Sequence, residues 1–348
     1  MSEWAIVLAG GAGTRFWPAS RVARPKQLLP LASSEPLLAA TVHRIAPVVP
    51  ANRVVVVTGA HLLESTRAVV PEVPAENFLA EPVPRNTAPA IAWATAEIAR
   101  RDPDALCMVL PSDHFIATPD AYVAAVKTAL DGARRGYLTT LGIRPSRAET
   151  GFGYIEVGKE IAPHVHEAAR FVEKPNLEIA QKYVASGNFL RNAGMFFYAA
   201  KAMNDAIGEH LPDVAAKALE CLDASALGRV FPTMQSISID HGVMEKAKRV
   251  AVVPGDFGWS DVGSWQSSWE LADKDDAGNA APEGAIVIDG KNNLVWDRTG
   301  SGRTYALVGV SDLVVVETED AVLIVPRDRA QDVRLAVERL KAAGSKRV

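Results

Sequence analysis

The sequence has 348 residues, of which 48% are hydrophobic, enough for one large domain and a smaller one. Its formal net charge of −4 excludes a general attraction to nucleic acid or to an anionic membrane surface. The two cysteines, Cys107 and Cys221, show no metal-ligand or redox spacing, and no stretch approaches the roughly 20 apolar residues of a membrane span. We therefore expect a cytoplasmic protein in which any phosphate binding is local.

Short apolar runs recur over the first 143 residues, with helical spacing between several of them. The runs lie at residues 5–9, 54–58, 77–80, 106–110 and 138–143. The segment NTAPAIAWATAEIARR places Ile91, Thr95 and Ile98 on one face of a helix. This alternation predicts an α/β fold with a Rossmann-like, doubly wound, mostly parallel sheet. Ligands of such sheets bind beyond the carboxyl ends of the strands.

The pattern changes at residue 151. Between 151 and 260 the segments GFGYIEVG, ARFVEKP and NAGMFFYAA predict paired strands, with helices at about 176–186 and 200–222. We expect these residues to form a sugar-binding lobe over the sheet edge, within a catalytic domain of residues 1–275. After a linker at 273–284, five short strands and a helix at about 327–343 follow. Residues 285–348 are therefore predicted to form a small β-rich domain ending in a helix, without a clear repeat period.

The first strand runs into the glycine-rich turn GGAGTR, for which three phosphate-binding interpretations compete. A Walker A loop requires Gly-Lys-Ser/Thr, but Thr14 and Arg15 follow Gly13. A dinucleotide-binding fingerprint requires a third small residue where Phe16 stands, and is weak. In the third interpretation, backbone N–H groups of a tight loop face a triphosphate, and Arg15 and Lys26 supply positive charge. On this motif alone, a turn with a solvated arginine stays an alternative.

Nine segments occur in order over residues 1–265. They are LAGGAGTRFWP, RPKQLLPL, EPVPRNTAPAIA, LPSDHFI, GFGYIEVG, FVEKP, NAGMFFY, SIDHGVMEK and FGWSDVGSW. Together they resemble the sugar nucleotidyltransferases, and among them the mannose-1-phosphate guanylyltransferases. The resemblance implies a nucleotidyltransferase core, Mg²⁺ as cofactor with Mn²⁺ as a substitute, and the reaction of GTP with mannose 1-phosphate to give GDP-mannose and pyrophosphate. It also suggests a homodimer to which residues 285–348 contribute.

Nucleotidyl transfer is an in-line attack on the α-phosphorus, so it requires alignment and neutralisation of negative charge. Three cations are the predicted catalytic residues: Arg15 and Lys26 for the leaving pyrophosphate, and Lys174 for the sugar phosphate, although Lys174 taken alone reads as a solvated surface residue. Glu81 can accept hydrogen bonds from N1–H and the 2-amino group of guanine, a donor pair that the other bases lack on one edge. The whole predicted nucleotide-binding set is Leu8, Ala9, Gly10, Gly11, Gly13, Thr14, Arg15, Lys26, Glu81, Asn86, Thr87, Ala88, Pro111, Ser112 and Asp113.

Two aspartates, Asp113 and Asp261, are predicted to hold the metal, because Mg²⁺ takes only one or two protein carboxylates besides phosphates and water. For Asp113, directly after a strand, a helix N-cap is the alternative role, and Asn86 and Thr87 can also be caps. Side chains that bind sugar hydroxyls and glycines that allow close approach define the sugar-phosphate set. Its members are Gly153, Glu173, Lys174, Asn192 and Gly194.

Two other functions stay open at this stage. A nucleotidyltransferase for another sugar 1-phosphate, such as a heptose or glucose, would use the same charges. A non-catalytic sensor of nucleotide sugars would share the fold, but the retention of both carboxylates and all three cations argues against it.

Overall fold

The computed structural model describes residues 1–11 and 13–348, so Ala12 of the predicted loop lies outside the described residues. The chain divides into two compact units. Unit 1 comprises residues 1–10, 41–112 and 116–259, and unit 2 comprises residues 11–40, 113–115 and 260–348. The domain boundary predicted near residues 275–285 therefore falls inside unit 2, and the two-domain division stays a prediction.

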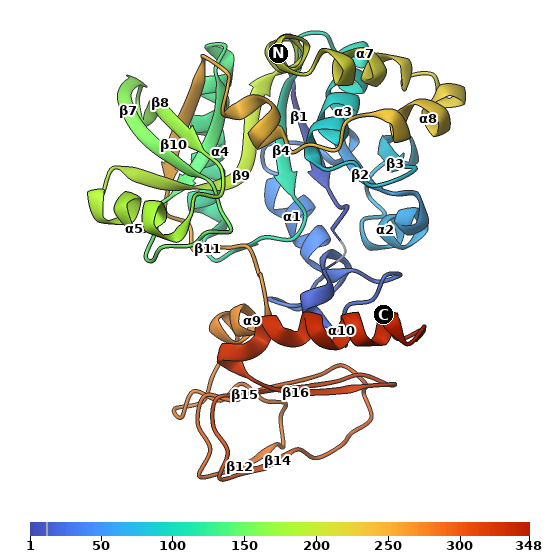
Figure 1. Cartoon of the computed structure of the whole chain (residues 1–348), viewed down its shortest axis with the longest axis vertical. Helices are drawn as coiled ribbons and strands as arrows, with labels where there is room; N and C mark the ends of the chain where they lie inside the picture. The colour runs from blue at the N-terminus through green and yellow to red at the C-terminus, as the bar shows by residue number, and fades with distance from the viewer. Residues whose placement is uncertain (12) are drawn as a thin grey trace. The chain divides into compact units, whose positions relative to one another are not determined.

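Unit 1 is built on a nine-stranded sheet with the strand order β3-β2-β1-β4-β9-β6-β10-β8-β7 (Figure 1). The strands are β1 (Glu3–Leu8), β2 (Val54–Gly59), β3 (Phe78–Glu81), β4 (Leu106–Pro111), β6 (Leu138–Ile143), β7 (Tyr154–Ala162), β8 (Val165–Val172), β9 (Phe189–Ala199) and β10 (Val250–Gly255). β1 pairs in parallel with β2 and β4, and β2 with β3. β9 is antiparallel to β4 and to β6. The sheet is thus mixed and mostly parallel, as predicted.

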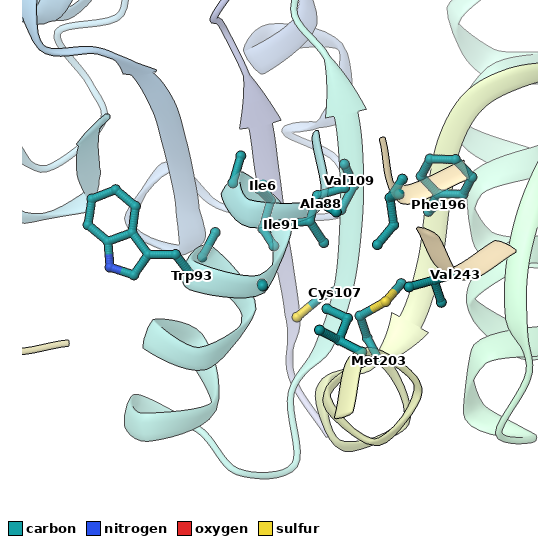
Figure 2. Close-up of a cluster of buried hydrophobic side chains, with 14 of the residues drawn as sticks. Ile6, Ala88, Ile91, Trp93, Cys107, Val109, Phe196, Met203 and Val243 are labelled. Atoms are coloured by element: carbon teal, nitrogen blue, oxygen red, sulfur yellow. The ribbon is translucent and has the colours of Figure 1, made fainter. Parts of the chain in front are cut away.

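The helices of unit 1 pack along this sheet or on one another. They are α2 (Leu63–Val69), α3 (Thr87–Arg101), α4 (Pro119–Arg134), α5 (Leu177–Ser186), α6 (Ala200–His210), α7 (Pro212–Glu220) and α8 (Ala224–Val230). Figure 2 shows Ala88 and Ile91 of α3 beside Ile6 of β1 and Val109 of β4, all four of them buried. The apolar face predicted for this helix therefore closes the core and fixes the start of α3 near the carboxyl ends of the strands.

The segment expected to form a lobe contributes strands to the same sheet. β9 lies between β4 and β6, and β7 and β8 extend the sheet at its end. The helical stretch predicted at about 200–222 is two helices, because Pro212 cannot continue α6 and instead occupies the first turn of α7. Residues 151–259 are thus continuous with the rest of unit 1.

Unit 2 has its own core around Trp265, which is fully buried. Its elements are the 3₁₀ helices η1 (Thr14–Phe16), η2 (Lys26–Leu28) and η8 (Arg327–Asp332), the strands β12 (Ile286–Ile288), β13 (Leu294–Asp297), β14 (Ala306–Val308), β15 (Leu313–Glu317) and β16 (Val322–Pro326), and the helices α9 (Trp265–Leu271) and α10 (Val333–Ala342). The Trp265 ring meets Phe16 edge to face at 5.1 Å, and its Nε1–H donates to the Trp17 carbonyl at 3.1 Å. These contacts anchor the segment after the glycine turn. The chain passes from one unit to the other within three short elements, which are α1 (Leu37–Ile45), β5 (Phe115–Ile116) and β11 (Trp259–Ser260).

The C-terminal strands form a structural repeat. β12 pairs in parallel with β14, and β13 with β15. Asn293 Oδ1 accepts a hydrogen bond from the N–H of Leu313, 20 residues further on, and Asn293 Nδ2 donates to the Val310 carbonyl at 3.0 Å. Buried asparagines thus join successive coils by satisfying their backbone groups. The expectation of no repeat period was wrong. The coils share an alternation of apolar residues but very few identical residues, so the period is hard to recognise in the sequence.

No helix in the described part of the chain has the length and apolar composition needed to cross a bilayer.

Candidate functional site

The predicted guanine ligand Glu81 lies at the carboxyl end of β3, beside Gly10, which lies two residues after the end of β1. A Cβ placed on Gly10 would lie 3.4 Å from Glu81 Oε2, so the Gly10 backbone adjoins the carboxylate. The Glu81 side chain is only 8% exposed, and its Oε1 has no hydrogen-bond partner among the described residues. A buried acceptor without a donor is costly, and such groups mark places where a ligand supplies the missing bonds.

Burial raises the pKa of Glu81 from 4.5 to about 7. No described donor or cation opposes this effect strongly enough to restore the ordinary value. Near neutral pH the carboxyl group is therefore divided between its protonated and charged forms, and the charged form is destabilised until a donor reaches it.

The loop after Glu81 supplies the cap of α3. Asn86, with φ 65°, accepts a hydrogen bond from Thr87 N through its side chain at 2.9 Å, so its predicted capping role is confirmed. Thr87 Oγ1 accepts from Ile239 N at 2.9 Å, and Ala88 N donates to the Ile237 carbonyl at 3.1 Å. The polar groups of Thr87 and Ala88 are thus used within the protein, and their nucleotide contacts stay predictions.

The ends of β1 and β4 are held by backbone bonds. Ala9 N donates to the Val57 carbonyl at 2.7 Å, and Ser112 N donates to the Leu8 carbonyl at 3.1 Å. Pro111 ends β4, where its ring would lie 3.9 Å from a Cβ placed on Gly194. The predicted residues that follow these strands are therefore held by backbone hydrogen bonds at the carboxyl end of the sheet.

In unit 2, Gly13 and Lys26 approach each other so closely that only glycine fits. Gly13 has φ 56°, and a Cβ there would lie 2.8 Å from Lys26 N. The Gly13 carbonyl accepts a hydrogen bond from Ser20 Oγ at 2.7 Å. Gly13 is also the N-cap residue of η1. The glycine of the predicted phosphate loop is thereby fixed against the lysine predicted to share its ligand.

The Lys26 ammonium joins the two aspartates predicted to bind metal. Its Nζ lies 2.9 Å from Asp113 Oδ2 and donates to the carbonyls of Asp261 and Val262 at 3.1 and 3.2 Å. Burial favours the neutral form of Asp113, but Lys26 and His114 outweigh it and lower its pKa, so the carboxylate is charged. Asp113 caps no helix, since α4 begins later at Pro119 after Thr118.

The turn that carries Asp261 is unusual in its backbone. Val262 has φ 45°, a conformation that a β-branched residue adopts only when its surroundings impose it. A Cβ on Gly263 would come within 2.9 Å of Asp261 Oδ2, so this glycine leaves room for the carboxylate. Such local strain is typical of functional turns.

Arg15 of η1 is exposed, and no described carboxylate lies within ion-pair distance of it. Gly11 is exposed and Thr14 is half-buried. Within the described residues no group of three or more histidine, cysteine or acidic side chains could hold a metal ion. Asp113 and Asp261 thus form a sparse donor set, which suits an ion that takes most of its ligands from phosphates and water.

The predicted sugar-phosphate residues come together in unit 1. A Cβ on Gly153 would lie 2.5 Å from Glu173 Oε2, and Asn192 N donates to the Gly153 carbonyl at 2.8 Å. Lys174 Nζ pairs with Glu173 Oε1 at 3.0 Å, and the Lys174 side chain is 57% exposed. Gly194, with φ 68°, donates its N–H to Asn192 Oδ1 at 3.1 Å. One face of unit 1 therefore combines an exposed ammonium with a nearly buried carboxylate and amide.

Asp240 belongs to this group, although it is not among the predicted site residues. It accepts a hydrogen bond from Asn192 Nδ2 at 2.9 Å and starts the π-helical turn η7 (Asp240–Met244). Burial and the neighbouring Glu173 charge raise its pKa from 3.8 to about 7. The only sequence signal was a carboxylate among apolar residues in SIDHGVMEK, and its partner Asn192 is 48 residues away.

Comparison with known proteins identifies the family. Residues 4–278 match the family described as Nucleotidyl transferase. The chain belongs to the nucleotidyl transferase family. Residues 283–340 match a further family, described as MannoseP isomerase/GMP-like beta-helix domain, in agreement with the parallel coils of unit 2. The two family matches meet between residues 278 and 283, which lies within unit 2.

Individual relatives cover nearly the whole of this nucleotidyl transferase. Mannose-1-phosphate guanylyltransferase of Escherichia coli K12 is 41% identical over 97% of this chain and 73% of its own length. The xanthan biosynthesis protein XanB of Xanthomonas campestris is 42% identical with the same coverage. A crystal structure described as mannose-1-phosphate geranyltransferase of Thermus thermophilus superposes with a TM-score of 0.89, at 37% identity, over 98% of this chain and 100% of that one.

We predict that Asp240→Asn stabilises the free protein above neutral pH. The folded-state pKa of about 7 lies above the ordinary 3.8, so folding takes up a proton and the wild type loses stability as pH rises through 7. Urea unfolding should give the variant an advantage of about 2 to 4 kcal/mol at pH 8 that vanishes near pH 4. The exposed Asp205→Asn serves as control, and an advantage independent of pH would contradict the prediction.

Proposed function

We propose that the protein transfers GMP from GTP to α-D-mannose 1-phosphate and releases pyrophosphate. Membership of the nucleotidyl transferase family and the name of the E. coli relative support this reaction. The observation that carries the choice of base is Glu81, a nearly buried carboxylate with an unpaired oxygen beside the Gly10 backbone. Guanine offers an N1–H and a 2-amino group to such a carboxylate, whereas adenine presents an acceptor at N1.

For the phosphates, the proposed ligands are the backbone of Gly11 and Gly13 with the side chains of Arg15 and Lys26. An exposed guanidinium can bind two phosphate oxygens at once, while the lysine ammonium acts as a point charge. Lys26 is engaged by Asp113 and by the carbonyls of Asp261 and Val262. Its charge is therefore positioned by the protein before a triphosphate binds, which fits a reaction that depends on alignment.

For the sugar phosphate, the proposed ligands are Lys174 on the phosphate and Glu173 and Asn192 on the hydroxyl groups. Asn192 Oδ1 already accepts from Thr140 Oγ1 at 3.0 Å and from Gly194 N, and its Nδ2 donates to Asp240. Only the second hydrogen of Nδ2 stays available, so Asn192 can donate one bond to the sugar. Glu173 then supplies the acceptor, and Gly153 allows the ring to approach it.

The residues present fit a divalent cation. Asp113 and Asp261 would hold Mg²⁺, with Mn²⁺ as a substitute, and the ion when bound would offset the negative charge of the phosphates. Asp113 is held in its charged form by Lys26 and His114, as a metal ligand must be. The strained turn at Val262 presents Asp261 beside the same ammonium.

The experiment that tests this function is pyrophosphate release from four nucleoside triphosphates, each with mannose, glucose and heptose 1-phosphates. GTP with mannose 1-phosphate should give the highest kcat/KM. A higher value for another sugar would redirect the substrate assignment within the family, and the absence of turnover with every pair would favour a nucleotide-sugar sensor.

We predict that Glu81→Gln narrows the preference for GTP over ATP. The amide presents one acceptor and one donor, so it cannot satisfy both guanine donors. Loss of a charged hydrogen bond costs about 1 to 3 kcal/mol, a decrease of roughly 5-fold to 150-fold in kcat/KM for GTP. Steady-state kinetics with both nucleotides at saturating mannose 1-phosphate measure the ratio. Glu76→Gln, an exposed change in the preceding turn, is the control, and an unchanged ratio would place guanine recognition elsewhere.

We predict that Asp113→Asn and Asp261→Asn each lose most of their activity at fixed Mg²⁺ while the circular dichroism spectrum is retained. Each change removes a negative charge that the cation requires, so the Mg²⁺ concentration for half-maximal rate should rise at least ten-fold, with partial rescue by Mn²⁺. Asp256→Asn, an exposed aspartate in the same region, should behave as wild type. A variant that keeps the wild-type rate at limiting Mg²⁺ would show that its residue is no metal ligand.

We also propose that unit 2 forms a homodimer contact. Ile286 and Ile288 of β12 are each 50% exposed, and Val308 of β14 is 60% exposed, on the outward positions of two paired strands. Exposed apolar side chains in register are typical of interfaces. Sedimentation at micromolar concentration should show a dimer that Ile288→Lys dissociates and Lys291→Ala retains. A wild-type monomer would contradict this proposal.

A further inference from the structure

A cavity of about 520 Å³ lies within unit 2 and contains none of the candidate site residues. Three segments line it, residues 18–30, 296–299 and 317–320. Small-molecule sites typically enclose about 300 to 1,000 Å³, so this cavity is much larger than a single phosphate ion requires. It is therefore large enough for a nucleotide.

Three arginines line the cavity, and two of them have no acidic partner. Arg21 pairs with Asp320 at 2.8 Å. Arg24 and Arg298 are exposed, and no carboxylate in the described part of the chain lies within ion-pair distance of either. Two unpaired guanidiniums at one cavity can each bind two oxygens of a diphosphate.

Of the three carboxylates that line the cavity, two are already bonded to groups of the protein. Glu317 is buried and is bonded to the Tyr305 hydroxyl at 2.6 Å and to Arg303. Asp320 forms an ion pair with Arg21. Glu319 is exposed and lines the cavity, so a ligand that carries vicinal hydroxyl groups can donate to it.

The rest of the wall includes several apolar side chains. It includes Trp296, which is half-buried, together with Leu29 and Pro30. The Arg298 guanidinium lies over the Trp296 ring at 5.9 Å from its centroid. An aromatic ring next to a cation suits a ligand in which a heterocycle adjoins an anion.

We propose that this cavity is a second ligand site that binds a nucleoside diphosphate, free or as part of a nucleotide sugar. Arg24 and Arg298 bind the diphosphate, Glu319 accepts from the ribose hydroxyls, and the base lies in the apolar part beside Trp296. The cavity is distinct from the substrate site by its residues, although it accepts the same class of molecule.

The cavity shares a segment with the proposed phosphate ligands. Leu29, which lines the cavity, donates its N–H to the Lys26 carbonyl at 3.0 Å, and Arg24 precedes Lys26 by two residues. A ligand that immobilises Arg24 and Leu29 therefore acts on the backbone that carries Lys26. This regulatory consequence, unlike the binding itself, rests on the proposed function of Lys26.

Isothermal titration calorimetry with GDP tests the proposal on the full chain. The wild type should show two classes of site. The double change Arg24→Ala with Arg298→Ala should weaken one class at least ten-fold, and Glu81→Gln should weaken the other. Arg334→Ala, an exposed arginine of α10 outside the cavity, should keep both. In kinetics, GDP should inhibit the wild type with a component that is not competitive with GTP, and the double variant should lose that component.

Pyrophosphate and guanosine, as partial probes, should each bind the cavity at least ten-fold more weakly than GDP. Three results would overturn the proposal: a single wild-type site that disappears in Glu81→Gln, unchanged GDP binding in the double variant, or pyrophosphate binding as tightly as GDP. Arginine-dependent binding of GDP in a protein without turnover would reject the proposed function and leave the cavity proposal standing.

Discussion

The Lys26 ammonium holds together three parts of unit 2 that are distant in the sequence. It lies 2.9 Å from Asp113 Oδ2 and donates to two carbonyls, those of Asp261 and Val262, at 3.1 and 3.2 Å. All three donors of the ammonium are thereby satisfied, which is what a largely buried lysine needs. The same contacts stabilise the left-handed conformation of Val262, which costs of order 1 to 3 kcal/mol without support. The ammonium therefore supports both the charged form of Asp113 and the position of the turn at Val262.

In unit 1 two carboxyl groups, those of Glu81 and Asp240, have no ion-pair partner among the described residues. Glu81 has no described donor at Oε1, and Asp240 receives one bond from Asn192, so burial raises the pKa of both to about 7. Folding is opposed by such groups, and the cost is recovered only when a ligand donates hydrogen bonds to them. Discrimination between ligands follows from the same free-energy cost of an unpaired buried carboxylate. A molecule that cannot donate leaves the carboxylate unpaired, which is a stronger source of selectivity than an apolar pocket offers.

Local patterns in the sequence predicted much of the fold, whereas the sets of site residues stay predictions and their pairing could not be deduced from residue types. The run at residues 138–143 is β6 itself, because a strand buried on both faces is apolar whatever its partners are. The position of β9 between β4 and β6 could not be predicted, since an antiparallel insertion depends on contacts between distant residues. Asp113 and Lys26 were assigned separate ligands, yet they form an ion pair. Asp240 was passed over because its role depends on Asn192, which the fold and not the sequence brings near.

The segment from Gly13 to Pro30 has more constraints on it than its irregular structure suggests. Gly13 must accommodate the Lys26 backbone, Phe16 packs on Trp265, and Leu29 bonds back to Lys26. Arg21 is tied to Asp320, next to the β-helix strand β15. Each of these contacts lies within unit 2, so the proposed phosphate-binding residues belong physically to the β-helix unit, although their sequence lies beside β1 of the sheet. A change in the coils can therefore alter the position of Lys26 through packing alone. The C-terminal residues thus help to position the cations on which the proposed chemistry depends.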